Sequence, residues 1–380
     1  MSNIRDPKIE EKIAKKLAEW EKAKREEIAN EERKKEEAER EKRMKEEKTW
    51  LGHMESAAAK IKDAVPTAIA NEESLKMREG YEIKRVDVAN GRNAKIYRAV
   101  DKHGTEMYAK LVMVPGAKKK IADSFREASK CLKYLKSHSH QNVMKIYDIF
   151  TTKEKIYVFI EKLNLVKIKG GGTADEATAQ KWSKDVASGL HFLHVHGIAH
   201  NHLLPENILI DSYDNLKIAG FLSATLSYDS TNKTIRKLDP LDEYFPHDSP
   251  ERIKGPFDPF KADVFAFGVM IIFFMTREFP FAFAGRDKSN LPLSVQWKLC
   301  LRRKKVDIST ELKDLLVDLF EVDVDKRPHI RHAAAKEWFT KEIAPTAPPP
   351  PESTTPPESQ GAAPAPAEPT EPKPESPPTA

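Results

Sequence analysis

Cysteine and long apolar runs are both scarce in this sequence of 380 residues. Its two cysteines, Cys131 and Cys300, show none of the paired spacings that are typical of a disulfide scaffold or a zinc site. The longest apolar stretch, residues 264–275, is too short and too interrupted to cross a bilayer. The charged N-terminus has no apolar core of a signal peptide. These absences predict a cytoplasmic, intracellular protein without a membrane span.

A strong excess of one charge is also missing. The formal net charge is +5, although 32% of the residues are charged. Nucleic-acid-binding domains usually carry a marked basic bias, so the sequence does not indicate a nucleic-acid partner. Hydrophobic residues make up 39% of the chain, which is enough for one large domain with polar appendages.

Residues 1–48 form the first polar appendage. Glu, Lys and Arg dominate it, and opposite charges recur three and four residues apart, which favours a helix. A stripe formed by Ile9, Ile13, Leu17 and Trp20 fades after that tryptophan. The segment is therefore either a solvated single helix or a weak coiled coil. Residues 49–80 are expected to add a more amphipathic helix and a linker.

Residues 342–380 form the second appendage. From Pro345 onward they hold 14 of the 26 prolines. Such a composition cannot bury enough apolar surface to offset chain entropy, so we expect a disordered, proline-rich tail. Its proline runs are either solvated or docked on a domain that reads polyproline II.

Residues 81–341 are expected to form the folded domain. Strand-like alternation marks residues 81–86, 95–100 and 107–112, with a turn at residues 101–104. A helix is predicted over residues 121–135, and two further strands over residues 143–151 and 155–161. Beyond Ala174 the pattern is mainly helical. This order predicts an α+β, bilobal architecture with a β-rich N-lobe and a helical C-lobe.

An ordered set of motifs in this domain resembles the eukaryotic protein kinase family. Lys110 stands at the end of the strand that carries the family's lysine, and Glu127 stands where its partner helix has a glutamate. His200 begins the segment that is similar to the catalytic loop. Glu251 and Arg327 match a glutamate and an arginine that pair in the family. The resemblance implies the protein kinase fold.

Three positions depart from that pattern where the family performs its chemistry. His202 replaces the carboxylate that accepts the proton of the substrate hydroxyl, and Leu204 replaces a lysine that steadies the γ-phosphate. Gly220 replaces the aspartate that binds magnesium, and glycine offers no oxygen ligand. The resemblance therefore implies three degenerate catalytic positions and no functional catalytic residue.

Four retained residues mark a possible vestigial nucleotide site. Gly91 is the surviving glycine of the loop that covers the phosphates. Lys110 and Glu127 either anchor phosphate or link a strand to a helix. Asn207 either binds a second metal or bonds to the loop backbone. We expect no metal site and no cofactor, although ATP could bind without productive Mg²⁺.

The sequence thus predicts a pseudokinase, which is not an enzyme but a protein-binding scaffold or allosteric regulator in signalling. Its expected partners are proteins, such as an active kinase or a signalling assembly. One alternative is a weak or atypical ATP-dependent protein kinase. Another is a cytoskeletal or structural interaction protein that uses the charged helix and the proline-rich tail.

Overall fold

The computed structural model describes residues 7–90, 94–114, 119–165, 173–213, 215–240, 245–281 and 291–343. Two predicted features lie outside these ranges: Gly91 of the nucleotide loop, and the proline-rich tail from residue 344 onward.

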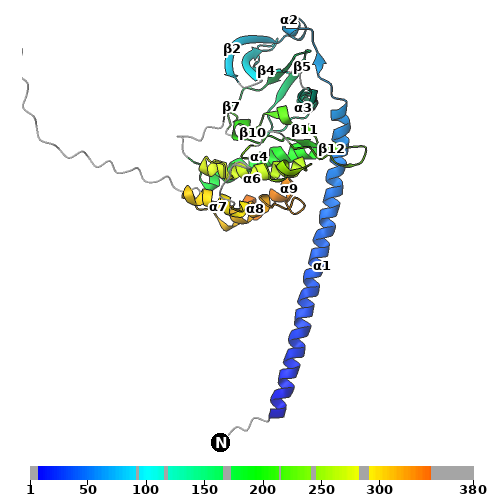
Figure 1. The fold of residues 1–380 in the computed structure, drawn as a ribbon, viewed down its shortest axis with the longest axis vertical. Helices are drawn as coiled ribbons and strands as arrows, with labels where there is room; N and C mark the ends of the chain where they lie inside the picture. The colour runs from blue at the N-terminus through cyan, green and yellow to red at the C-terminus, as the bar shows by residue number, and fades with distance from the viewer. Residues whose placement is uncertain are drawn as a thin grey trace, which may run out of the picture. The chain divides into compact units, whose positions relative to one another are not determined.

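A six-stranded sheet forms the small lobe within the described residues (Figure 1). Its strands lie in the order β1-β5-β6-β4-β3-β2, and all neighbours are antiparallel except β1 and β5. The strands are β1 (Thr67–Ala68), β2 (Glu82–Asn90), β3 (Ala94–Val100), β4 (Glu106–Met113), β5 (Ile146–Thr151) and β6 (Lys155–Ile160). A short α2 (Glu72–Ser74) and η1 (Leu75–Glu79) precede β2.

The predicted strands of this lobe are confirmed. In β4, Met107, Ala109 and Leu111 are buried, as the alternation of the sequence requires. The turn before β4 forms because Asp101 Oδ1 accepts hydrogen bonds from the backbone N–H groups of His103 and Thr105, at 2.9 and 2.8 Å. The predicted helix after β4 is α3 (Lys119–Ser137).

Helices dominate the large lobe, which confirms the predicted α+β, bilobal architecture. They are α4 (Glu176–Val195), α5 (Glu251–Lys254), α6 (Pro259–Thr276), α7 (Leu293–Arg303), α8 (Thr310–Leu319), α9 (Ile330–Ala333) and α10 (Glu337–Thr340). Short elements lie between α4 and α5: β8 (Ile198–Ala199), η3 (Pro205–Asn207), β9 (Ile208–Ile210), β10 (Leu216–Ile218), η4 (Phe221–Ser223), β11 (Thr225–Leu226), β12 (Tyr228–Asp229) and β13 (Thr234–Ile235). β7 (Asn164–Leu165) pairs with β9.

Helix α6 is the central helix of the large lobe. It begins where Asp258 accepts hydrogen bonds from the N–H groups of Phe260 and Lys261, and it ends at Arg277, which has a left-handed backbone. Within the described residues it is the one helix apolar and long enough to span a membrane, and 94% of it is buried inside the protein. An apolar helix that is buried on all sides is typical of a domain core.

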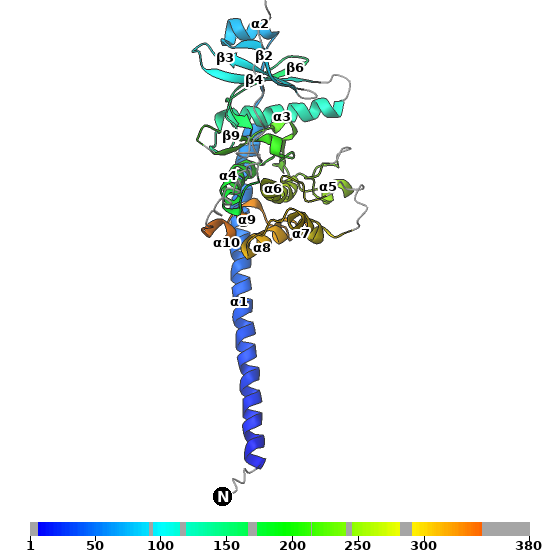
Figure 2. The same cartoon turned by 90° about the vertical axis from the view of Figure 1, so that its left-hand side faces the viewer.

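Helix α1 (Pro7–Lys62) continues through the boundary predicted at residues 48–49. The expectation of two separate helices is therefore wrong for the described residues. Apolar residues on its last turns, spaced as one helical stripe, are buried: Trp50, Met54, Ala57, Ala58 and Ile61. Figures 1 and 2 show this part of α1 beside the large lobe, where it contacts α4 and β12.

Packing against the large lobe holds the C-terminal part of α1 in place. The Trp50 ring lies 4.6 Å from His329 and 5.8 Å from Phe260, measured between ring centroids. Arg331 Nη1 donates to the Glu46 carbonyl oxygen at 2.8 Å. Between residues 22 and 48, the side chains that the structure describes are exposed, apart from a half-buried Glu46. The helix therefore has an anchored part and a solvated part.

Candidate functional site

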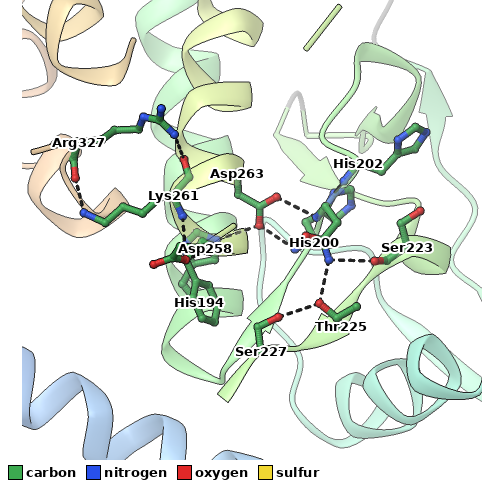
Figure 3. A network of polar contacts seen from close by, with 12 residues as sticks. His194, His200, His202, Ser223, Thr225, Ser227, Asp258, Lys261, Asp263 and Arg327 are labelled. Atoms are coloured by element: carbon green, nitrogen blue, oxygen red, sulfur yellow. Dashed lines mark hydrogen bonds and ion pairs between the residues drawn. The ribbon is translucent and has the colours of Figure 1, made fainter. Parts of the chain in front are cut away.

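One buried carboxylate, that of Asp263 on α6, organises the loop between β8 and η3 (Figure 3). It accepts hydrogen bonds from the backbone N–H groups of His200 and Asn201, at 2.7 and 2.8 Å. His194 Nε2 lies 3.1 Å from the same carboxylate. Burial works to raise the pKa of Asp263, but His194 and the loop N–H donors hold that pKa below its ordinary value. The loop is thus fixed by an ionised carboxylate.

His200 uses both of its ring nitrogens inside this loop. Nε2 lies 2.7 Å from the Ala219 carbonyl oxygen, and Nδ1 accepts from the backbone N–H of His202 at 3.3 Å. This arrangement requires the tautomer that carries its proton on Nε2. Burial lowers the pKa of His200, which agrees with a neutral ring. His200 therefore packs and orients the loop, and it has no nitrogen left for a metal ion.

Asn201 connects the loop to neighbouring segments through hydrogen bonds. Its φ is +60°, a left-handed conformation that asparagine tolerates better than most residues. Its Nδ2 donates to the Ser223 carbonyl oxygen and to Thr225 Oγ1, at 3.0 and 2.8 Å, and these contacts are drawn in Figure 3. Arg252 Nη1 donates to the Asn201 carbonyl oxygen at 2.9 Å.

His202 is half-buried, and its ring makes no hydrogen bond to another described residue. The rings of Phe245 and His247 lie 5.2 and 5.4 Å away, both edge-on. Burial lowers the pKa of His202 to about 4, and the charges of Arg252 and Lys110 act in the same direction. The imidazole is neutral at neutral pH and can accept a proton.

Asn207 occupies the space beside Gly220. A Cβ built on Gly220 would lie 2.1 Å from Asn207 Oδ1, and the glycine has a φ of +83°. Asn207 Nδ2 donates to the His202 carbonyl oxygen at 2.8 Å. Of the two roles that the sequence left open for Asn207, the bond to the loop backbone is present and uses Nδ2, which leaves Oδ1 beside Gly220. This placement of Oδ1 leaves no room for an aspartate side chain at position 220 without movement of Asn207.

Leu204 is half-buried and begins η3, where its carbonyl oxygen accepts from the N–H of Asn207 at 2.9 Å. A leucine supplies apolar contact but no charge for a phosphate. The three predicted degenerate positions, His202, Leu204 and Gly220, therefore lie around one short loop.

Lys110 lies on β4, and its register partners are Ile96 on β3 and Val158 on β6. Burial lowers the pKa of Lys110. No ion pair joins its ammonium group to another described residue. A desolvated cation of this kind is suited to an anion such as a phosphate.

Glu127 on α3 pairs with Arg236 rather than with Lys110. Glu127 Oε1 lies 2.6 Å from Arg236 Nη2, which comes from the segment after β13. The pairing of Lys110 with Glu127, in either role that the sequence allowed, is therefore absent from this structure. Sequence reasoning missed Arg236 because nothing in its local pattern identifies a partner 109 residues away.

Glu251 and Arg327 form the predicted ion pair. Arg327 donates through Nη1 and Nη2 to the two carboxylate oxygens, at 2.5 and 3.0 Å. Its side chain is fully buried. Lys261 Nζ donates to the Arg327 carbonyl oxygen, as Figure 3 shows. The bidentate geometry and the burial identify this pair as a structural link.

A second buried cluster lies next to the loop and was not predicted from the sequence. Asp248 Oδ1 lies 2.6 Å from Arg252 Nη1, and both side chains are buried. His247 is 1% exposed, and neither ring nitrogen has a hydrogen-bond partner among the described residues. Burial lowers the pKa of His247 to about 2. No local sequence pattern indicates this cluster beyond its place before Glu251.

Comparison with known protein families identifies the family to which the chain belongs. Residues 83–339 match the model of the protein kinase domain. The chain belongs to the protein kinase family. In this chain the family's catalytic loop corresponds to the segment from His200 to Asn207, which Asp263 holds in place.

Curated proteins that resemble this chain are named serine/threonine protein kinases. The chain is 29% identical to "Probable serine/threonine-protein kinase KCC4" of Saccharomyces cerevisiae, over 54% of its own length and 20% of that protein. It is 28% identical to "CBL-interacting serine/threonine-protein kinase 7" of Arabidopsis thaliana, over 54% of its own length and 47% of that protein. It is 30% identical to "Serine/threonine-protein kinase GIN4" of Saccharomyces cerevisiae, over 51% of its own length and 17% of that protein. The matched part is less than half of each relative.

One prediction from the sequence needs correction. The expectation that the chain is not an enzyme is contradicted by the comparisons, because the matched domain is a protein kinase domain and the relatives are named serine/threonine protein kinases. The replaced residues at positions 202, 204 and 220 are thus features of a kinase-family chain.

Protein kinases use ATP together with Mg²⁺. The residues of this chain fit these two groups unequally. Lys110 is a half-buried cation with no described counterion, which fits a nucleotide phosphate. At position 220 the chain has no carboxylate, and Asn207 Oδ1 fills the place where one would project. The site therefore does not fit a magnesium ion held in the family's manner.

Proposed function

We propose that the chain is an atypical ATP-dependent protein kinase. The observation that carries the proposal is the half-buried imidazole of His202 in the catalytic loop, which is neutral and makes no ring hydrogen bond to another described residue. In the proposed reaction the oxygen of a protein hydroxyl forms a bond to the γ-phosphorus of ATP, and the bond from that phosphorus to the bridging oxygen breaks. The hydroxyl proton passes to His202, and ADP leaves.

The rate should be low for two physical reasons. A base with a pKa of about 4 is weaker than the optimum near the working pH. Leu204 and Gly220 also supply no charge to stabilise the transferring phosphoryl group, and charge neutralisation is the main source of catalysis in this chemistry. Lys110 is the described cation that can contribute to it.

The test is transfer of labelled γ-phosphate from ATP to a mixture of hydroxyl-bearing peptides, measured with no divalent ion, with Mg²⁺ and with Mn²⁺. Lys110→Ala should abolish the transfer. His202→Ala should reduce it by about 10²–10⁴-fold, the usual contribution of a general base. Lys95→Ala, an exposed lysine on the neighbouring strand, should leave it unchanged. Absence of transfer under all three conditions, or full activity of Lys110→Ala, would disprove the proposal.

Binding of a protein partner is a second candidate function, compatible with the first. It is supported by the exposed part of α1, whose described side chains carry both signs of charge from Lys22 to Lys48. The partner would be a protein with interspersed charges, and the proline-rich tail would add a site for a polyproline-reading domain. Removal of residues 1–44 keeps the Glu46 and Trp50 contacts, so loss of partner capture without loss of stability would support this role. Capture that persists in the truncated chain would assign recognition to the kinase domain.

Both functions are proposed for an intracellular, reducing compartment, where ATP is available. The buried, unpaired thiols of Cys131 and Cys300 are compatible with that setting.

A further inference from the structure

A turn formed by residues 245–248 covers the ring of His202, which the proposed function uses as a base. Asp248 closes this covering turn, since its Oδ2 accepts from the backbone N–H of Phe245 at 2.7 Å and its own N–H donates to the Phe245 carbonyl oxygen at 2.9 Å. The rings of Phe245 and His247 contact the His202 ring edge-on. No hydrogen bond joins the His202 ring to another described residue, so packing against these two rings orients it.

Arg252 connects the covering turn to the catalytic loop. Its Nη1 donates to Asp248 Oδ1 at 2.6 Å and to the Asn201 carbonyl oxygen at 2.9 Å. The two charged side chains are 6% and 2% exposed, and a charge-assisted hydrogen bond is strong in such a setting. The guanidinium carbon lies 5.4 Å from the centre of the Phe257 ring. One nitrogen atom therefore joins the residue before His202 to the turn that covers its ring.

The same arrangement determines which charges surround His202. The charged or titratable groups near its ring are His200, His247, Arg252 and Lys110. Burial lowers the pKa of both other histidines, so they are neutral at neutral pH. Burial is also the largest cause that lowers the pKa of His202, and the positive charges of Arg252 and Lys110 act in the same direction. The covering turn supplies part of that burial, and Arg252 supplies one of the two charges.

We propose that Arg252, acting through Asp248 and Asn201, is a positioning residue for His202. It holds the loop backbone and the covering turn in one arrangement, and the turn in turn fixes the ring. The role of His202 as a base rests on the proposed function, whereas the placement of its ring does not. If Arg252 served only to stabilise the fold, its replacement would leave the surroundings of His202 unchanged in every variant that still folds.

NMR titration of the His202 ring protons tests this placement. In the natural chain the ring should show no midpoint between pH 5 and pH 8, because its pKa is about 4. Arg252→Gln removes a positive charge and releases the turn, so the pKa should move upward into this range. Arg252→Lys keeps a charge and one donor nitrogen, and it should restore most of the natural behaviour. Lys254→Gln, an exposed change on the same helix α5, should have no effect.

Asp248→Asn provides a second variant in case Arg252→Gln does not fold. An amide has one oxygen where the carboxylate has two, so it cannot accept from both Phe245 and Arg252 in the present geometry. The turn is then released while the charge of Arg252 remains, and the His202 pKa should rise by less than in Arg252→Gln. A cooperative urea transition identifies the folded variants. An unchanged His202 titration in the folded variants would overturn the proposal.

Phosphoryl transfer gives a separate measurement that does depend on the proposed function. Arg252→Gln should lower kcat by about 10²-fold through misplacement of His202, and it should leave the KM for ATP unchanged because Lys110 is untouched. A shifted titration with no transfer by any variant would support the positioning role and refute the proposed function. Transfer at the natural rate together with an unchanged titration would refute the positioning role alone.

Discussion

At the scale of single residues, Asn207 packs directly against Gly220. The amide group of Asn207 fills the space that an aspartate side chain would need, and it is held there by its bond to the His202 carbonyl oxygen. Replacement of Gly220 alone thus cannot recreate a magnesium ligand in this arrangement. The side chain of Asn207 thus fills the space next to position 220, where the chain has no carboxylate.

We expect Gly220→Asp to lower the free energy of unfolding by about 1–3 kcal/mol, because a side chain there meets Asn207 and the backbone has a positive φ. Gly220→Ala tests the strain without the charge. In a double-mutant cycle with Asn207→Ala, the two changes should couple, with the combined loss smaller than the sum. Urea denaturation measures these free energies, and strict additivity would show that Asn207 is not the obstacle.

Buried neutral histidines form a second feature at the residue scale. Burial lowers the pKa of His247 to about 2, and that of His329 to about 2 as well. An unfolded chain takes up a proton at these groups below pH 6.5, whereas the folded chain does not. Their titration therefore does not affect the free energy of unfolding above pH 6.5. That free energy falls as the pH drops from 6.5 toward the pKa values of the folded state.

For His247 the loss at pH 5 should be about 2 kcal/mol, at ~1.36 kcal/mol per pH unit below 6.5. His247→Phe keeps a ring next to Phe245 but removes the titrating group, so it should flatten the dependence of stability on pH. His103→Phe, at an exposed position, is the control. Denaturation at pH 7 and pH 5 provides the comparison, and an equal slope in His247→Phe and in the natural chain would contradict the assignment.

At the scale of elements, α1 combines a solvated part with an anchored part. Trp50 is 4% exposed and is the largest of the buried side chains on its stripe. Helix propensity and ion pairs can maintain a polar helix, but they do not attach it to a domain. The attachment depends on the apolar stripe from Trp50 to Ile61.

Trp50→Ala should therefore lower the free energy of unfolding by about 3–5 kcal/mol, as expected for loss of a buried aromatic side chain. Met44→Ala, where the side chain is 63% exposed, should change it by less than about 0.5 kcal/mol. Both values come from urea denaturation of the full chain. A small effect of Trp50→Ala would mean that α1 is not docked in solution.

At the scale of the whole molecule, Glu127 and Arg236 link the two lobes. The pair joins α3 of the small lobe to the segment after β13 in the large lobe. It also keeps Glu127 away from Lys110, which has no described counterion. The pair is partly exposed, so its direct contribution to stability is small.

Arg236→Gln should release Glu127 and allow it to approach Lys110. We expect the unfolding free energy to change by less than about 1 kcal/mol. The affinity for ATP should fall about fivefold, a coupling of ~1 kcal/mol, because the Glu127 carboxylate would neutralise the Lys110 charge that attracts the phosphates. Lys237→Gln, an exposed neighbour, is the matched control. Calorimetric titration with ATP measures the effect, and identical affinity in Arg236→Gln and the control would exclude this link between the lobes.

Local patterns in the sequence were sufficient for the two lobes and for the strands of the small lobe, but not for the continuity of α1. Alternation in residues 107–112 indicates a half-buried strand, and the spacing from Trp50 to Ile61 indicates a helix with one apolar face, because burial acts on side chains at the period of each structure. The absence of a carboxylate at position 220 is likewise decided by the sequence alone, since glycine has no side chain to contribute under any fold. The family positions of Lys110, His202 and Glu251 follow from the order of the motifs.

Tertiary structure alone decided the partners of these residues. Glu127 pairs with a residue 109 positions away, Asn207 closes over Gly220, and α1 docks on the large lobe. Such contacts join segments that are distant in the chain, and their energies depend on distance and burial, which no local pattern encodes. The sequence thus determined which chemical groups are present, and only the fold decided which of them meet.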